Sequence, residues 1–122
     1  MIGYICIGTD DPPRAAKFYD PLLAVLGAKR QWENERAIGW GTSQDGSMLI
    51  LIKPLNGQPA TVGNGTMVSL SAGSKALVDA VYKQAMALGG KDEGPAGARS
   101  EGFYAAYFRD LEGNKLAVYH TG

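Results

Sequence analysis

Residues 5–20 read ICIGTDDPPRAAKFYD, and this stretch decides the fold because a strand pattern changes into a helix pattern within it. Ile5 and Ile7 alternate with other residue types, as in a strand that is covered on at least one face. Asp10 and Asp11 then precede two prolines, so a side-chain acceptor stands just before residues whose dihedral angles suit a first helical turn. The stretch predicts a strand followed directly by a helix.

The pattern continues as a helix and then as short strands. Gly27 supplies the helix stop, and Pro21 predicts a bend of the helix near Tyr19 to Pro21, because a proline inside a helix removes one hydrogen bond. The apolar stripe of the helix consists of Ala15, Ala16, Phe18, Tyr19, Leu22, Leu23 and Leu26. Three strands are expected next, at about 28–33, 37–42 and 48–53.

The same order of elements begins again after a link rich in Gly, Asn and Pro at 54–65. A strand at 66–72 precedes a helix that Ser74 caps and the Gly89-Gly90 pair ends. The remaining expected segments are a weak strand at 91–93, a polar loop at 94–101, and strands at 103–109 and 115–120.

Counting along the chain supports an internal repeat. An offset of 63 residues sets Tyr4 against Met67 and Gly27 against Gly90, and the offset drifts to 67 where Gly46 matches Gly113. We therefore expect an α+β fold of two βαβββ modules within one domain covering 1–122. Module 1 spans about 1–54, a crossover loop 55–65, and module 2 about 66–122.

Composition narrows the function classes. The 122 residues are 45% hydrophobic and 20% charged, which is typical of a water-soluble globular domain. Twelve basic residues balance twelve acidic ones, so the sequence shows no excess of positive charge for binding nucleic acid or an anionic membrane. The single cysteine excludes an internal disulfide, and no secretion signal is seen, so we expect a cytoplasmic protein.

Several short motifs, in this order and spacing, resemble the vicinal oxygen chelate superfamily, which includes glyoxalase I, extradiol dioxygenases and bleomycin-resistance proteins. They are ICIGTDD running into RAAKFYD, LGA after the first helix, and YAAYFRD followed by EGNKL. The resemblance implies modules whose strands form a curled mixed sheet around a central pocket, with the helices outside. It also implies a homodimer.

The resemblance also assigns four metal-ligand positions, one on the first and one on the last strand of each module. In metal-dependent relatives they commonly carry two histidines and two carboxylates. The matching residues here are Tyr4, Ile50, Met67 and Ala117, with a slip from Ile50 to Leu51 left open. This set lacks the imidazole, thiolate and carboxylate ligands that zinc or iron requires, and the only histidine, His120, falls on the opposite face of its strand. We predict neither metal nor cofactor.

Strand alternation indicates which residues line a ligand pocket, because one alternating set is uniformly apolar and the other is mixed. Packing remains an alternative for Cys6, since free cysteines are often buried. Core or dimer packing remains open for the aromatic residues, and an exposed edge position for Arg36, Arg109 and Lys115. The predicted pocket residues are Tyr4, Cys6, Trp40, Ile50, Met67, Ser69, Tyr107, Arg109, Ala117 and Tyr119.

Three functions are compatible with these observations. The first is a metal-independent member of the superfamily that binds or sequesters a small molecule. The second is a lactoylglutathione-lyase-like or dioxygenase-like enzyme with a non-standard site, for which the fold resemblance is the only support. The third is a dimeric interaction module.

Overall fold

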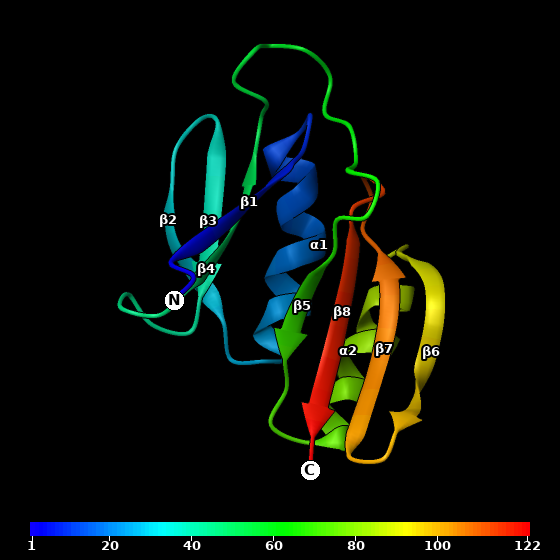
Figure 1. Cartoon of the computed structure of the whole chain (residues 1–122). Helices are drawn as coiled ribbons and strands as arrows, with labels where there is room; N and C mark the ends of the chain where they lie inside the picture. The colour runs from blue at the N-terminus through cyan, green and yellow to red at the C-terminus, as the bar shows by residue number, and fades with distance from the viewer. The chain divides into compact units, whose positions relative to one another are not determined.

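The computed structural model describes all 122 residues, which divide into two compact units, Met1–Val62 and Gly63–Gly122. Each unit contains one helix and four strands, in the order strand, helix, strand, strand, strand. The boundary between the units lies inside the predicted link. The expected α+β fold of two βαβββ modules is therefore confirmed (Figure 1). The single-domain organisation stays a prediction.

The first unit carries a four-stranded mixed sheet of order β1-β4-β3-β2. Strand β1 runs parallel to β4, and the other neighbours are antiparallel. A parallel pair needs a long crossover connection, and α1 lies within the one between β1 and β4, packing on β2, β3 and β4. The elements are β1 (Tyr4–Gly8), α1 (Pro12–Ala24), β2 (Lys29–Glu33), β3 (Ala37–Gly41) and β4 (Met48–Ile52).

Helix α1 begins as the sequence predicts and continues past its internal proline. The Asp11 side chain accepts a hydrogen bond from the Arg14 backbone N–H at 3.1 Å, which satisfies one of the free donors at the helix start. Pro21 lies inside α1 without ending it, since α1 is one helix from Pro12 to Ala24, and the bend expected near Pro21 stays a prediction. The carbonyl that lacks a partner because of Pro21 belongs to Lys17, which is exposed, so water can satisfy it.

The second unit repeats this topology with the sheet order β5-β8-β7-β6, in which β5 and β8 are the parallel pair. Helix α2 starts at the Ser74 cap, whose hydroxyl accepts the Leu77 N–H at 3.2 Å, and packs on β6, β7 and β8. The strands thus form two four-stranded sheets. The elements are β5 (Val68–Ser71), α2 (Lys75–Ala87), β6 (Lys91–Ser100), β7 (Phe103–Arg109) and β8 (Lys115–Thr121).

Strand β6 corrects the sequence prediction. The weak strand expected at 91–93 extends to Ser100 and includes most of the segment expected to be a polar loop. Gly94, Pro95 and Gly97 usually mark turns, but here they occur where the β6–β7 pairing changes register. Such irregularities are compatible with glycine and with an edge strand, and β6 is at the edge of its sheet.

The hydrophobic core of each unit lies between its sheet and its helix. In the first unit it includes Trp40 and Leu51, and in the second Phe108 and Val118, none more than 1% exposed. Burial of each such side chain contributes about 1.5–3 kcal/mol. Neither helix is long and apolar enough to span a membrane.

Candidate functional site

Each sheet has one face toward its helix and an opposite face, called here the open face. Residues paired across neighbouring strands share a face, so the strand registers identify the members of each open face. The first open face contains Tyr4, Cys6, Lys29, Trp32, Gly39, Gly41, Met48 and Ile50. The second contains Ser69, Ser71, Phe103, Ala105, Tyr107, Arg109, Lys115, Ala117 and Tyr119.

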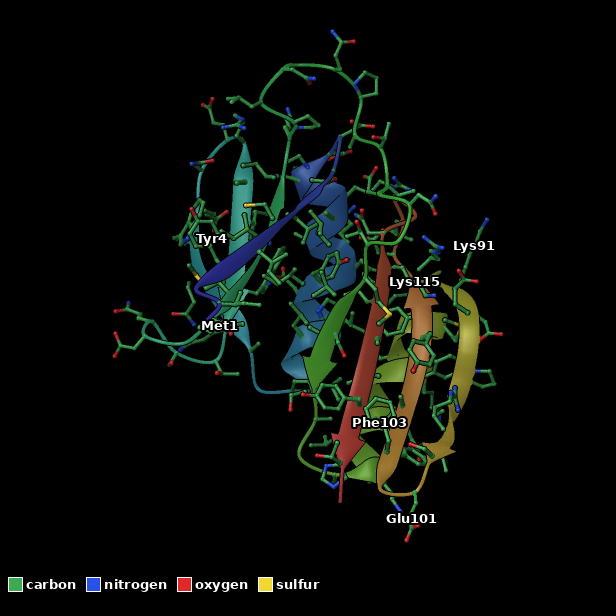
Figure 2. The ribbon with its side chains drawn as sticks, in the orientation of Figure 1. Met1, Tyr4, Lys91, Glu101, Phe103 and Lys115 are labelled. Atoms are coloured by element: carbon green, nitrogen blue, oxygen red, sulfur yellow. The ribbon has the colours of Figure 1, made fainter.

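The first open face is mostly apolar and partly aromatic. Strands β1, β3 and β4 carry no charged residue. Trp32 lies across Gly39: a Cβ on Gly39 would be 3.2 Å from the Trp32 indole nitrogen and 3.4 Å from an Ile50 side-chain carbon. Tyr4 is 62% and Trp32 39% exposed, so both present aromatic surface on this face, and Figure 2 labels Tyr4 on its strand.

Cys6 also belongs to the first open face, and the packing role considered for it is wrong. The thiol is free and the residue is exposed. Its strand partner is Ile50, which is 3% exposed. The pairing matches the second unit, where Ser69 pairs with Ala117, so the internal repeat aligns these two positions of one unit with the two of the other.

The second open face combines aromatic rings with small residues on two adjacent strands. Tyr107 pairs with Ala117, and Ala105 pairs with Tyr119, so each ring faces an alanine across the β7–β8 pair. Phe103 stacks on Tyr119, with centroids 5.7 Å apart and planes inclined by 20°. The serines of β5 add exposed hydroxyl groups at Ser69 and Ser71. Such a face offers stacking surface and hydrogen-bond donors together.

Three cationic side chains accompany these rings, but they differ in their partners. Arg109 is paired: its Nε donates to Glu93 Oε1 at 2.8 Å and its Nη1 to the Gly113 carbonyl at 3.0 Å. Lys115 Nζ lies 5.8 Å and Arg99 Cζ 5.3 Å from the centroid of the Tyr107 ring. Arg99 comes from β6 and was missed in the sequence analysis because its segment was expected to be a loop.

Trp40 does not belong to an open face. It pairs with Leu49, is 1% exposed, and lies beside Tyr19 of α1 with ring centroids 5.6 Å apart. Its indole N–H donates to Asp20 Oδ1 at 2.8 Å. The structure therefore places Trp40 in the core, whereas Trp32, which the sequence analysis did not select, lies on the first open face.

Asp20 joins α1 to strands β2 and β3. Besides the Trp40 indole, it accepts two hydrogen bonds from the Arg30 guanidinium, at 3.0 and 2.7 Å. The hydrogen bond from Arg30 is the main reason why the pKa of Asp20 lies below its usual value. Partial burial raises this pKa, and the hydrogen bond from Trp40 lowers it further. This network links α1 to the sheet on its helix-facing side, away from the first open face.

Tyr104 of β7 also lies on a helix-facing side. Its hydroxyl donates to Asp79 of α2 at 2.6 Å, and this hydrogen bond raises the pKa of the phenol. His120 shares that side, and its Nδ1 is 3.0 Å from the Ala72 carbonyl oxygen. Neither side chain contributes to the second open face.

Arg36, the third cation considered from sequence, lies away from both open faces. Its Nη2 donates to the Lys53 carbonyl at 3.0 Å. With Lys53 and Asp10 it lines an open cleft of about 480 Å³ at the end of β4. A second cleft, of about 460 Å³, contains Arg109 and Glu93 and adjoins the β7–β8 turn.

Comparison with known proteins identifies the family of this fold. The model of the Glyoxalase/Bleomycin resistance protein/Dioxygenase superfamily matches residues 1–118. The chain belongs to this superfamily. A glyoxalase/bleomycin resistance protein from Albidiferax ferrireducens T118 is 35% identical over 100% of this chain and 99% of its own, with a TM-score of 0.92.

Two solved structures of lower sequence identity share the fold. A lactoylglutathione lyase from Agrobacterium tumefaciens is 25% identical, with 98% of this chain and 92% of its own covered and a TM-score of 0.70. TioX from Micromonospora sp. ML1 is 21% identical, with 100% and 99% coverage and a TM-score of 0.70. No curated protein sequence matches significantly.

In this superfamily member the four positions matched to metal ligands do not fit a metal ion. Tyr4, Ile50, Met67 and Ala117 supply one phenol oxygen and one thioether between them. Zinc and non-haem iron sites need three or more imidazole, thiolate or carboxylate ligands. No group of three His, Cys, Asp or Glu side chains elsewhere is arranged to hold a metal.

Proposed function

We propose that this protein binds a small molecule on the open faces of its sheets and does so without a metal ion. The observation that carries the proposal is the chemistry of the matched positions. Tyr4, Ile50, Met67 and Ala117 replace ligands by aromatic, aliphatic and thioether groups. Of the four, Tyr4 and Met67 are 62% and 44% exposed and offer surface for burial and stacking rather than coordination, whereas Ile50 and Ala117 are 3% and 2% exposed.

The neighbouring residues support binding of an organic molecule. Tyr4, Cys6 and Trp32 are exposed on the first open face. Tyr107, Ser69 and the other members of the second open face add rings, hydroxyls and cations. Ligand sites typically combine apolar surface with a few polar groups that orient the ligand. The 35% identical relative is named a glyoxalase/bleomycin resistance protein, and this name is compatible with sequestration of a small molecule.

An enzymatic function is the second candidate, supported by the likeness to a lactoylglutathione lyase at 25% identity. An activity of that kind here would have to use residues other than the four matched positions. A shared fold alone does not establish that a protein catalyses a reaction. The residues described above include no paired nucleophile and base. Binding is therefore the function we favour over isomerisation or ring cleavage.

Two further elements belong to the proposal. We expect a homodimer, because Tyr4 and Trp32 are large apolar residues of the first open face with exposed fractions of 62% and 39%, and grouped apolar exposure is typical of interaction surfaces. An interaction module without a ligand would be the remaining alternative. The free Cys6 thiol is compatible with a reducing cytoplasm.

A thermal-shift screen of a metabolite and antibiotic library tests the proposal. At a hundredfold excess over its Kd, a ligand that binds only the folded protein adds about 2.7 kcal/mol to the free energy of unfolding. We expect at least one compound to raise Tm. The shift should be lost in Tyr4→Ala or in Tyr107→Ala, according to the face that binds.

Tyr82→Phe provides the control, since Tyr82 lies on α2. Its Tm shift should equal that of the unmodified protein. If no compound raises Tm, or if the shift persists in both alanine variants, the open faces are not binding surfaces and the proposal is refuted.

A further inference from the structure

The second open face holds two positive charges that no carboxylate neutralises. Arg99 and Lys115 are absent from the ion pairs of the chain, and the only hydrogen-bond acceptor of the Arg99 guanidinium is the Pro95 carbonyl. Lys115 also pairs across the strands with Arg109. Like charges placed opposite each other are unfavourable, and Glu93 neutralises only Arg109. Arg99 and Lys115 therefore have no carboxylate partner on this face.

The charged groups of Arg99 and Lys115 both lie beside the ring of Tyr107. Arg99 and Lys115 are 5.3 and 5.8 Å from its centroid, inside the roughly 6 Å range of cation–π attraction. Arg99 reaches this place because β6 lacks side chains there: a Cβ on Gly94 would be 3.0 Å from the Tyr107 ring and 3.2 Å from an Arg99 guanidinium nitrogen. The sequence of β6 thus makes room for this arrangement.

The rest of the face provides flat apolar surface next to the charges. Ala117 lies opposite Tyr107, and the stacked Phe103–Tyr119 pair occupies the other end of the β7–β8 pair. Figure 2 shows Lys115 and Phe103 at opposite ends of these two strands. A molecule lying along the strands would meet cations at one end and aromatic rings at the other.

Resting on the proposed function, we infer that the ligand is a planar aromatic molecule with an anionic group, such as an aromatic carboxylate. The carboxylate lies between Arg99 and Lys115, and the ring stacks along Tyr107 toward Tyr119. The first open face differs, because strands β1, β3 and β4 contain no charge and strand pairing places one cation on it, Lys29 of β2 opposite Gly41. Arg109 orients the turn but is not the anion receptor, because Glu93 already neutralises it.

Binding of 2-naphthoate and of neutral 2-naphthamide, followed at the backbone amide signals of Tyr107, Ala117 and Tyr119, tests the inference. The two probes share a ring and differ in charge. We expect naphthoate to bind about tenfold more tightly, as charge-assisted hydrogen bonds are about twice as strong as neutral ones. Raising the salt concentration should weaken naphthoate binding and leave naphthamide binding unchanged.

Charge-removing variants assign the effect to residues. Arg99→Gln and Lys115→Gln should each weaken naphthoate binding by about five- to tenfold without changing the affinity for naphthamide. Lys83→Gln removes the same charge from an exposed position of α2 and should have no effect. Arg109→Gln should change affinity less than Lys115→Gln.

The outcomes separate this inference from the function on which it rests. Equal affinities for the two probes, or naphthoate binding that is unaffected in Arg99→Gln and Lys115→Gln, would overturn the anionic ligand class. If the library screen still yields a ligand for an open face, the proposed function stands in that case. Failure of the screen as well would refute both.

Discussion

Trp40→Ala is expected to lower the free energy of unfolding by about 3–5 kcal/mol, the range for truncating a buried aromatic residue. The side chain is 1% exposed, packs beside Tyr19, and donates its indole N–H to Asp20 at 2.8 Å. The substitution removes the largest fully buried side chain of the chain and leaves Asp20 without one donor. Urea unfolding followed by circular dichroism measures the loss.

Trp32 offers a matched control on the neighbouring strand. It is 39% exposed on the first open face, so Trp32→Ala should cost about 1 kcal/mol or less. Trp40→Phe, which keeps a ring but removes the donor, should give an intermediate loss of about 1.5–3 kcal/mol. Equal losses for Trp32→Ala and Trp40→Ala would contradict the assignment of Trp40 to the core.

Asp110→Ala is expected to lower the free energy of unfolding by about 3 kcal/mol, because buried donors left unpaired cost about 1–3 kcal/mol each. In the turn between β7 and β8, Asp110 Oδ1 accepts the backbone N–H groups of Glu112 and Asn114, both at 2.9 Å. Its Oδ2 accepts the Asn114 side-chain amide at 3.0 Å. Asp110 is 4% and Asn114 7% exposed, so water replaces these bonds poorly.

Asp45→Ala controls for removal of an acidic residue from a turn. Asp45 is exposed between β3 and β4, and the change should stay within about 0.5 kcal/mol. Asp110→Asn retains an acceptor and should fall between the two. A loss in Asp110→Ala no larger than that in Asp45→Ala would show that the turn is not held by this carboxylate. The turn matters to the ligand face because it precedes Lys115.

Much of the fold could be predicted from local signals. The N-cap side chains of Asp11 and Ser74 both accept the expected backbone bonds. Alternating apolar residues predicted seven of the strands within a few residues, because burial on one face requires that period. Strand β6 was different, since Gly94, Pro95 and Gly97 carry the local signal of a turn and pairing with β7 overrides it.

The site was harder to predict because the side of a strand depends on its partners. Strand β3 reads AIGWG, and every residue in it is buried, so its sequence does not reveal which side carries Trp40. The pairing of Trp40 with Leu49 decides this. Trp32 is the only hydrophobic residue in strand β2, which reads KRQWE, and that contrast is a signal the sequence analysis did not use. Arg99 was missed together with its strand.

Binding without a metal is the central claim, and one titration tests it most directly. Chelator-treated protein is titrated with 2-naphthoate, with and without equimolar Zn²⁺, while the amide signals of Tyr107 and Ala117 are followed. We predict saturable shifts with the same Kd in both samples. Shifts that appear only when Zn²⁺ is added would contradict the account, because the ligand would then be held by coordination.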